Sequence, residues 1–259
     1  MAAERVQWNG GLQEEADAIL AKGGGIVVCP TKVGYIILAA DHEGLERKFR
    51  VKGRARNKPG VVLCGSMEQL RTLARLTPEI EEFYRLHWEQ DILMGCILPW
   101  SEEGRALIPD DGSAELVMDG RGTSCFIIKF GTPGELLARS RWDAGRGLTF
   151  ASSANPSGQG NRGVVEGIGE AIAAEADLVI EGDEYVRSIQ PEATSETRYE
   201  QGVMVSFVDG RGALVPEQGG KRSVVPAPTV IRKGLDIDRI MMNLSACFNS
   251  WDYRHGEYY

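Results

Sequence analysis

The sequence contains few of the residues that build metal sites and disulfide frameworks. It has 3 histidines and 5 cysteines, and the cysteines are scattered along the chain with no Cys-x-x-Cys pair. This pattern argues against a zinc site and against a disulfide framework. Long hydrophobic runs are also missing, because the most apolar stretches, such as 25–29 and 35–40, have only the length of a β-strand. The N-terminal residues lack a hydrophobic signal core, so we expect a cytoplasmic protein with no membrane partner.

Familiar catalytic and nucleotide-binding motifs are absent as well. The sequence has no P-loop, no Gly-x-Gly-x-x-Gly fingerprint and no Gly-x-Ser-x-Gly elbow. None of the histidines, His42, His87 and His255, stands where a Ser-His-Asp arrangement is recognisable, and each is interpreted as structural or surface-exposed. These absences argue against a standard nucleotide-binding fold and against a hydrolase triad.

The charge of the chain is unevenly distributed. With 29 Lys and Arg against 37 Asp and Glu, the net charge is −8, which argues against a protein that coats nucleic acid. Residues 47–58 nevertheless contain seven Lys or Arg and no acid, which leaves 22 − 37 = −15 for the rest of the chain. Such a segment indicates a local anion-binding site, and the alternative is a solvated, charged helix end. The 259-residue length and the 42% hydrophobic content fit one large domain, alone or with an appendage.

Helical and strand-like patterns alternate over the first 180 residues. Helices are predicted at 12–22, 43–51, 67–76, 78–87, 134–142 and 164–176, and strands at 26–29, 35–39, 61–64, 92–98, 125–130 and 178–181. From about residue 203 short strands and turns follow, with an Asp-Gly hairpin signal at 209–210, a strand at 229–232 and a helix that begins at Asp236. This mixture predicts an α/β fold with a mixed parallel and antiparallel sheet and flanking helices.

Two segments carry polar groups suited to binding an anion. In Lys52-Gly53-Arg54 an ammonium and a guanidinium flank a glycine, and in an extended segment both side chains point to the same face. Residues 151–158, Ala-Ser-Ser-Ala-Asn-Pro-Ser-Gly, follow a strand-like run and present hydroxyl and amide groups where α/β sheets bind ligands. The alternatives are an ordinary basic triplet for the first segment and a plain turn for the second.

Taken in order, these segments resemble the YrdC-like family of threonylcarbamoyl-AMP synthases, of which the chain looks like a divergent member. The similarity begins at 24–31, Gly-Gly-Ile-Val-Val-Cys-Pro-Thr, with Tyr35 four residues on. It continues through 45–59, which contains the Lys-x-Arg pair, and through 152–158, Ser-Ser-Ala-Asn-Pro-Ser-Gly. Weaker counterparts of the family's closing strands stand at 206–209 and 231–234. The resemblance covers residues 10–240 as one domain and leaves 241–259 as a C-terminal tail.

The resemblance implies a twisted mixed sheet wrapped by helices around a deep, positively charged cavity. It implies that this cavity is lined by Lys52, Arg54, Ser153 and Asn155, with Thr31, Ser206 and Arg232 contributing nearby. The family's reaction joins threonine, bicarbonate and ATP, with Mg²⁺, releases pyrophosphate and serves a transfer-RNA modification. Lys52 and Arg54 are expected to neutralise charge on the phosphates, while Ser153 and Asn155 hold a phosphate oxygen or the carbamate.

The sequence departs from the family pattern in the part that the resemblance assigns to the amino acid. Where the family commonly reads Pro-Thr-Asp-Thr-Val-Tyr-Gly-Leu, the chain has Lys32 for the acid, Val33 for the hydroxyl and Ile36 for the glycine after the tyrosine. The family's Trp-Pro-Gly-Pro-Leu-Thr turn corresponds to 88–93, which has lost both prolines, and the arginine of a later strand corresponds to Lys129. A site that hydrogen-bonds a substrate loses it heavily when those partners are removed. We therefore interpret the phosphate half of the site as retained and the amino-acid half as changed.

Three functions are compatible with the resemblance. The first is ATP-dependent formation of a carbamoyl-adenylate type intermediate by a nucleotidyltransferase, from bicarbonate and a small amine or amino acid other than threonine. The second is the housekeeping threonylcarbamoyl-AMP synthase reaction, with threonine. The third, from another class, is a non-catalytic protein that binds a nucleotide or RNA, although the acidic net charge argues against nucleic acid as a stable partner. The sequence names neither the acceptor nor an oligomeric state.

Overall fold

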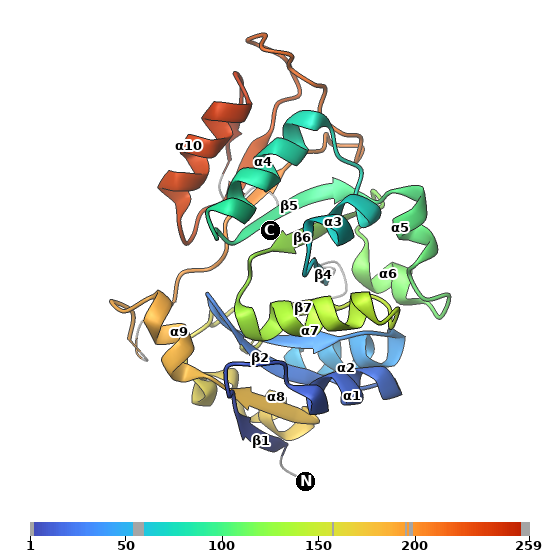
Figure 1. Ribbon diagram of the computed structural model, residues 1–259, viewed down its shortest axis with the longest axis vertical. Coiled ribbons are helices and arrows are strands. Elements are labelled where there is room, and N and C mark those ends of the chain that lie inside the picture. The colour runs from blue at the N-terminus through green and yellow to red at the C-terminus, as the bar shows by residue number, and fades with distance from the viewer. Residues whose placement is uncertain (1–2, 54–59, 157, 195, 197–198, 255–259) are drawn as a thin grey trace.

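The computed structural model describes residues 3–53, 60–156, 158–194, 196 and 199–254. In this part of the chain eleven strands form one sheet, in the order β1-β8-β2-β3-β7-β4-β6-β5-β9-β10-β11 (Figure 1). The strands are β1 (Glu4–Gln7), β2 (Val27–Thr31), β3 (Gly34–Ala39), β4 (Val61–Leu63), β5 (Met94–Pro99), β6 (Thr123–Ile128), β7 (Phe150–Ser153), β8 (Leu178–Glu181), β9 (Met204–Ser206), β10 (Thr229–Arg232) and β11 (Asp252–Tyr253).

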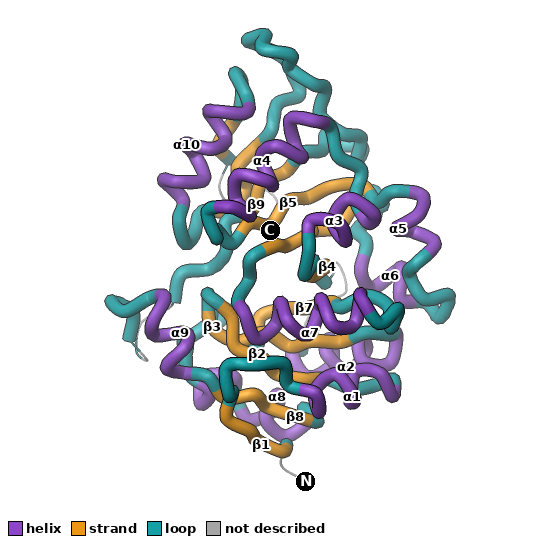
Figure 2. The backbone as a smooth tube through the Cα atoms, in the orientation of Figure 1, coloured by secondary structure: helices purple, strands orange, loops and turns teal. Residues whose placement is uncertain are grey.

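Helices lie on the outside of the strands (Figure 2). They are α1 (Glu14–Lys22), α2 (His42–Lys52), α3 (Met67–Leu73), α4 (Pro78–Glu89), α5 (Glu102–Ala106), α6 (Ser113–Val117), α7 (Thr132–Asp143), the 3-10 helix η1 (Val165–Ile168), α8 (Glu170–Glu175), α9 (Asp183–Ile189) and α10 (Ile237–Cys247). Among the described helices, none has both the length and the apolar character needed to cross a bilayer.

The sheet mixes parallel and antiparallel pairs, as the sequence predicts. β2 pairs antiparallel with β3 and parallel with β8, and β4 pairs parallel with β6 and antiparallel with β7. β5 pairs antiparallel with β6 and parallel with β9. Parallel partners such as β2 and β8 are distant in sequence, since a parallel pairing needs a crossover connection. The predicted α/β fold with a mixed sheet and flanking helices is confirmed.

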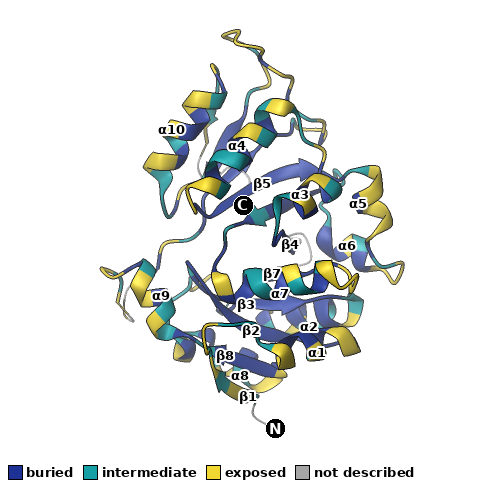
Figure 3. Cartoon of the chain, viewed as in Figure 1, coloured by how far each residue is buried: buried dark blue, intermediate teal, exposed yellow. Residues whose placement is uncertain are grey.

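Strand β2 is buried along its whole length, with apolar layers on both faces (Figure 3). Side chains that alternate along β2 enter different cores. Val27 and Cys29 belong to the apolar cluster that contains Leu137 of α7, whereas Val28 belongs to the cluster that contains Leu45 of α2. Each side of the sheet therefore has its own apolar layer, which is why β2 reads as a continuous apolar run in the sequence.

The structure corrects three local predictions. Lys52 is the last residue of α2, and Gly53 ends the helix in the left-handed conformation with φ +55°, so the extended segment predicted for Lys52-Gly53-Arg54 is wrong at Lys52. Arg54 lies outside the described residues. Ser152 and Ser153 belong to strand β7, so the plain-turn alternative is wrong for them. The helix predicted at 164–176 is divided into η1 and α8 by Gly169, whose φ of +87° no right-handed helix accommodates.

The C-terminal helix joins the core of the molecule. α10 runs across residue 240, where we predict a tail to begin, and it lies beside α4 (Figure 1). Leu244 and Phe248 are buried in the same apolar cluster as Phe83 of α4. The strand β1 and the short helices α5, α6 and α9 have no counterpart in the sequence prediction, because they are too short for a clear periodic pattern.

Candidate functional site

A cavity of about 830 Å³ lies on one face of the sheet. Its floor includes a row of residues at one level of five adjacent strands, namely Ala151, Val61, Cys125, Ile97 and Ser206. Side chains at one level of neighbouring strands share a face, and strands lie about 4.8 Å apart, so the row extends over about 19 Å. Its middle is mostly apolar, and the polar groups of the cavity lie around it.

Lys52 and Ser153 meet beside this row, although 101 positions separate them in the sequence. The Lys52 side chain is buried at the end of α2. Its Nζ donates hydrogen bonds to the carbonyl oxygen of Ser153 and, at 3.2 Å, to the Ser153 hydroxyl. Both residues line the cavity. The structure thus brings one member of the basic segment to the serine-rich strand end.

Two further polar atoms near Ser153 are buried without a hydrogen-bond partner. Asn155 donates its amide Nδ2 to Pro156 O at 2.8 Å, but its Oδ1 accepts no hydrogen bond from the described residues. The Ser152 hydroxyl also has no partner among the described residues, but alternation along β7 places it on the face of the sheet opposite to Ala151 and Ser153. Both residues are more than nine-tenths buried, and Asn155 lines the cavity. A buried acceptor without a partner is costly, and a bound ligand relieves that cost.

All six described residues of the predicted site line this one cavity: Thr31, Lys52, Ser153, Asn155, Ser206 and Arg232. Thr31 and Ser206 each donate their hydroxyl proton to a backbone carbonyl two or three residues further along the chain. Thr31 Oγ1 donates to Gly34 O at 2.7 Å, and Ser206 Oγ donates to Val208 O at 3.2 Å. Arg232 Nε donates to Gly202 O at 2.8 Å. Thr31 and Ser206 can still accept a hydrogen bond from a ligand, but they are not placed to donate one.

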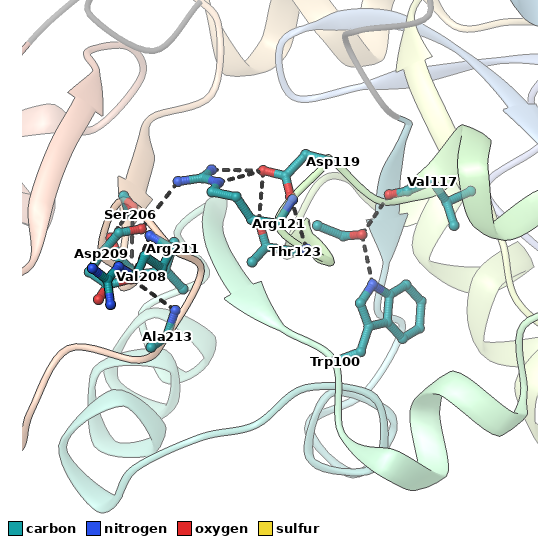
Figure 4. Close-up of polar contacts among 11 residues, drawn as sticks. Trp100, Val117, Asp119, Arg121, Thr123, Ser206, Val208, Asp209, Arg211 and Ala213 are labelled. Atoms are coloured by element: carbon teal, nitrogen blue, oxygen red, sulfur yellow. Dashed lines mark hydrogen bonds and ion pairs between the residues drawn. The ribbon is translucent and has the colours of Figure 1, made fainter.

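Three hydrogen-bonded residues that the sequence pattern did not predict, Asp119, Arg121 and Thr123, also line the cavity. Figure 4 shows their contacts. Arg121 Nε and Nη2 both donate to Asp119 Oδ2, at 2.9 and 2.7 Å, and Thr123 Oγ1 donates to the same oxygen at 2.9 Å. Burial acts to raise the pKa of Asp119, but the hydrogen bonds from Thr123 and Arg121 outweigh it and hold that pKa below the usual value. A signal was present in the sequence, because the tetrapeptide Asp-Gly-Arg-Gly occurs at both 119–122 and 209–212.

The charges that line the cavity favour an anionic ligand. Among the described lining residues there are three basic side chains, Lys52, Arg121 and Arg232, and one acid, Asp119. Because the basic residues outnumber the acid, the net charge of these residues is positive. Asp119 is in addition hydrogen-bonded by Arg121 and Thr123. Cys125 also lines the cavity, but burial raises its pKa to about 12, so its thiol is not a nucleophile at neutral pH.

Lys32 and Lys129 lie elsewhere, in a separate cavity of about 400 Å³. Both pair with the carboxylate of Asp91, at 2.8 and 2.9 Å. Burial acts to raise the pKa of Asp91, but hydrogen bonds from the two lysines hold it below its usual value. Of the three altered positions at 32, 33 and 36, only Val33 and Ile36 line the large cavity. Lys32 therefore does not alter the wall of that cavity, and Lys129 does not supply it with a cation.

The protein is of the α/β class, with a mixed sheet and a cavity lined by polar and basic residues on one face of that sheet. The model of the Sua5/YciO/YrdC family, described as "Telomere recombination", matches residues 19–194, which is more than half of the chain. The chain belongs to this family, as the sequence resemblance predicts.

Solved structures share the fold. A hypothetical protein, smu.1377c from Streptococcus mutans UA159, is 59% identical, with 100% of both chains covered and a TM-score of 0.94. E. coli YciO is 17% identical over 85% of this chain and 88% of its own, with a TM-score of 0.60. P. abyssi Sua5 complexed with L-threonine is 19% identical over 93% of this chain and 60% of its own, with a TM-score of 0.58. A search of curated proteins gives no match.

Proposed function

We propose that the protein is a nucleotidyltransferase that forms a carbamoyl-adenylate type intermediate from ATP, bicarbonate and a small amine or amino acid. The observation that carries the proposal is the contact of Lys52 with Ser153 at the wall of the cavity that Asn155 also lines, whose Oδ1 has no partner among the described residues. A buried ammonium beside hydroxyl and amide groups is suited to hold phosphate oxygens. Family membership supports the proposal, because the family that the sequence resembles includes threonylcarbamoyl-AMP synthases.

The cavity residues can supply what such a reaction needs without a nucleophilic side chain. In the reaction, an amine captures carbon dioxide, and a carbamate oxygen attacks the α-phosphorus of ATP with loss of pyrophosphate. Lys52 neutralises charge on the phosphate oxygens, and the Ser153 hydroxyl positions one of them. Asn155 Oδ1 is an acceptor for a donor group on the substrate. Positioning and charge stabilisation together are sufficient for phosphoryl chemistry of this type.

The described residues fit ATP better than they fit a protein-built metal site. No three His, Cys, Asp or Glu side chains among them lie close enough to hold a metal ion. The one described acid of the cavity, Asp119, is already engaged by Arg121 and Thr123. We propose that Mg²⁺ enters bound to the phosphate chain and neutralises part of its charge there.

The wall beside Lys52 favours an acceptor with an apolar side. Val33 and Ile36 line the cavity, and Ile36 pairs directly with Ser153 across β3 and β7. P. abyssi Sua5, which shares the fold, was solved with L-threonine, so the threonine reaction remains the second candidate. The acceptor that supports turnover distinguishes the threonine reaction from a reaction with another amine.

The test is pyrophosphate release with ATP, Mg²⁺ and bicarbonate, run with threonine, with other amino acids and with no acceptor. Mass spectrometry of the same mixtures identifies any carbamoyl-adenylate. Lys52→Ala is expected to lower the rate about 100- to 1000-fold, since it removes one electrostatic stabiliser. Lys22 likewise ends a helix, α1, but it is exposed and lies outside the cavity, so Lys22→Ala is the matched control and keeps the rate.

Equal melting temperatures of the two variants would show that the lost rate does not come from unfolding. Turnover with threonine alone would select the housekeeping reaction, and turnover with another amine would select the repurposed one. Full activity of Lys52→Ala, or no adenylate with any acceptor, is incompatible with the proposal.

A further inference from the structure

The two Asp-Gly-Arg-Gly segments fold into the same turn and pack against each other. In 119–122, Asp119 Oδ1 accepts from the backbone N of Arg121 at 2.9 Å and of Thr123 at 3.0 Å. In 209–212, Asp209 Oδ1 accepts from the backbone N of the residues two and four positions on, at 2.8 and 3.0 Å. A Cβ on Gly212 would lie 2.8 Å from Arg121 Cβ, so a glycine is needed where the turns touch.

The two arginines of these turns face different surroundings. Arg121 lines the large cavity and is held by Asp119, as Figure 4 shows. Arg211 is exposed, does not line the cavity, and its guanidinium makes no hydrogen bond or ion pair with the described residues. The chain thus contains, on identical turns, one arginine inside the cavity and one outside it.

Arg121 keeps donors that the described residues do not use. A guanidinium has five N–H donors. Three of those of Arg121 have acceptors in the described part of the chain: two point to Asp119 Oδ2, and the third reaches Asp209 O at a long 3.4 Å. Two donors are left for a ligand. Because Asp119 fixes the plane of the guanidinium, these donors are already oriented, and little side-chain entropy is lost on binding.

The position of Arg121 relative to Ser153 follows from the strand register. Val61 pairs with Ala151 of β7, and Val62 pairs with Phe126 of β6. Two residues further along, Ser153 and Thr123 therefore stand at the same level and on the same face of the sheet. β7 and β6 are separated by β4 alone, so the two residues lie about 10 Å apart. Arg121 precedes Thr123 by two residues and marks a second cationic position across the cavity from Lys52 and Ser153.

We propose that Arg121 binds a second oxyanion of the ligand, a phosphate or carboxylate group, on the far side of β4 from the group held by Lys52 and Ser153. The identity of the first group rests on the proposed function. The ligand, or the pair of substrates bound together, then carries two anionic groups separated by the apolar floor around Val61 of β4.

The test is isothermal titration calorimetry with ATP, with inorganic pyrophosphate and with L-threonine, on the wild-type chain and three variants. Arg121→Gln is expected to weaken at least one of these probes about 10- to 100-fold, as for loss of hydrogen bonds to a charged group. Arg121→Lys restores only part of the affinity, because an ammonium lacks the planar fork. Arg211→Gln changes the same turn outside the cavity and keeps wild-type affinity within about two-fold. Asp119 retains three donors in Arg121→Gln, namely two backbone N–H groups and the Thr123 hydroxyl, so the turn persists, and melting curves verify it.

Loss of affinity for ATP and pyrophosphate assigns a phosphate group to Arg121, and loss for threonine alone assigns a carboxylate. Unchanged affinity in Arg121→Gln overturns the inference and leaves the proposed function intact. An equal loss in Arg211→Gln also overturns it, because the effect would then be one of overall charge. If the wild-type chain binds none of the three probes, both the inference and the proposed function fail.

Discussion

Asp119 illustrates how one side chain can fix a cavity wall. Its carboxylate accepts hydrogen bonds from the backbone of Arg121 and Thr123, from the Thr123 hydroxyl and from the Arg121 guanidinium. These donors hold its pKa below the usual value despite its burial. The turn therefore favours the ionised carboxylate.

Asp119→Asn is expected to lower the free energy of unfolding by about 1–3 kcal/mol at neutral pH, the usual cost of losing charged hydrogen bonds. Because the folded-state pKa is depressed, this stabilisation is fully present above the usual value near 4 and is lost as pH falls through the folded-state pKa. The difference between wild type and variant should narrow as pH falls below about 4. Urea denaturation at pH 7 and pH 3 measures it, and a gap that widens in acid would contradict this account.

A residue of the cavity could be predicted from the sequence only where its neighbours along the chain form a recognisable motif. Lys52, Ser153 and Asn155 sit in segments that resemble a family pattern, and they line one cavity. Arg121 sits in a turn whose partner turn is 90 positions away in the sequence, so only the pairing of strands shows that it faces the same cavity. Lys129 continues an apolar strand pattern, but its left-handed backbone, with φ +52°, ends β6 and leaves its side chain with Asp91.

At the scale of elements, α4 and α10 are joined by a buried polar contact. His87 Nδ1 lies 2.6 Å from Phe83 O, so this nitrogen carries the proton. His87 Nε2 is then the acceptor facing the Asn243 amide Nδ2 at 3.4 Å. Protonation of Nε2 would place two donors against each other. Burial, the largest effect, lowers the pKa of His87 to about 4.

A histidine whose pKa is lowered on folding takes up its proton more readily in the unfolded state. Its contribution is complete above the unfolded value near 6.5 and is lost as pH falls toward 4, which amounts to roughly 3 kcal/mol. His87→Gln should therefore flatten the pH dependence of the free energy of unfolding between pH 7 and pH 4. Denaturation series at several pH values measure this slope. The matched control is His42→Gln at a half-exposed histidine, and equal flattening in both variants would refute the assignment.

Three of the predicted helices begin at side-chain caps. Asp41, Ser66 and Thr77 each accept a hydrogen bond from a backbone N–H three residues on, and α2, α3 and α4 begin directly after them. The predicted helix at 164–176 failed because its periodicity passes through Gly169, and periodicity alone does not show a left-handed residue. Strand order could not be predicted either, because it depends on crossovers between strands of similar composition.

At the scale of the whole molecule, the C-terminal segment closes the core. Phe248, directly after α10, packs on Phe83 of α4 and on Phe207 after β9, with ring centroids 6.1 and 5.3 Å apart. The chain beyond residue 240 thus supplies side chains to the cluster that joins the last strands to the rest of the sheet.

Phe248→Ala is expected to lower the free energy of unfolding by about 3–5 kcal/mol, the usual cost of emptying a buried aromatic site. Met242, on the same helix, is 73% exposed, so Met242→Ala should change it by no more than about 0.5 kcal/mol. Chemical denaturation of both variants provides the comparison. If Phe248→Ala is as neutral as its control, residues 241–259 behave as a dispensable tail.

The order of strands in the sheet also sets the order in which a chain leaving the ribosome can complete its parts. Glu4 of β1 pairs with Leu178, so β1 is synthesised long before its partner strand. β3 pairs locally with β2, but its second neighbour, which pairs Ser153 with Ile36, is synthesised much later. Long-range pairings of this kind slow folding. A nascent chain already carries Lys52 while Ser153 is still unsynthesised, and the wall around Ser206 and Arg232 is added last. Binding competence is therefore acquired only near the end of translation, and a cavity ligand reports on completed chains rather than on nascent ones.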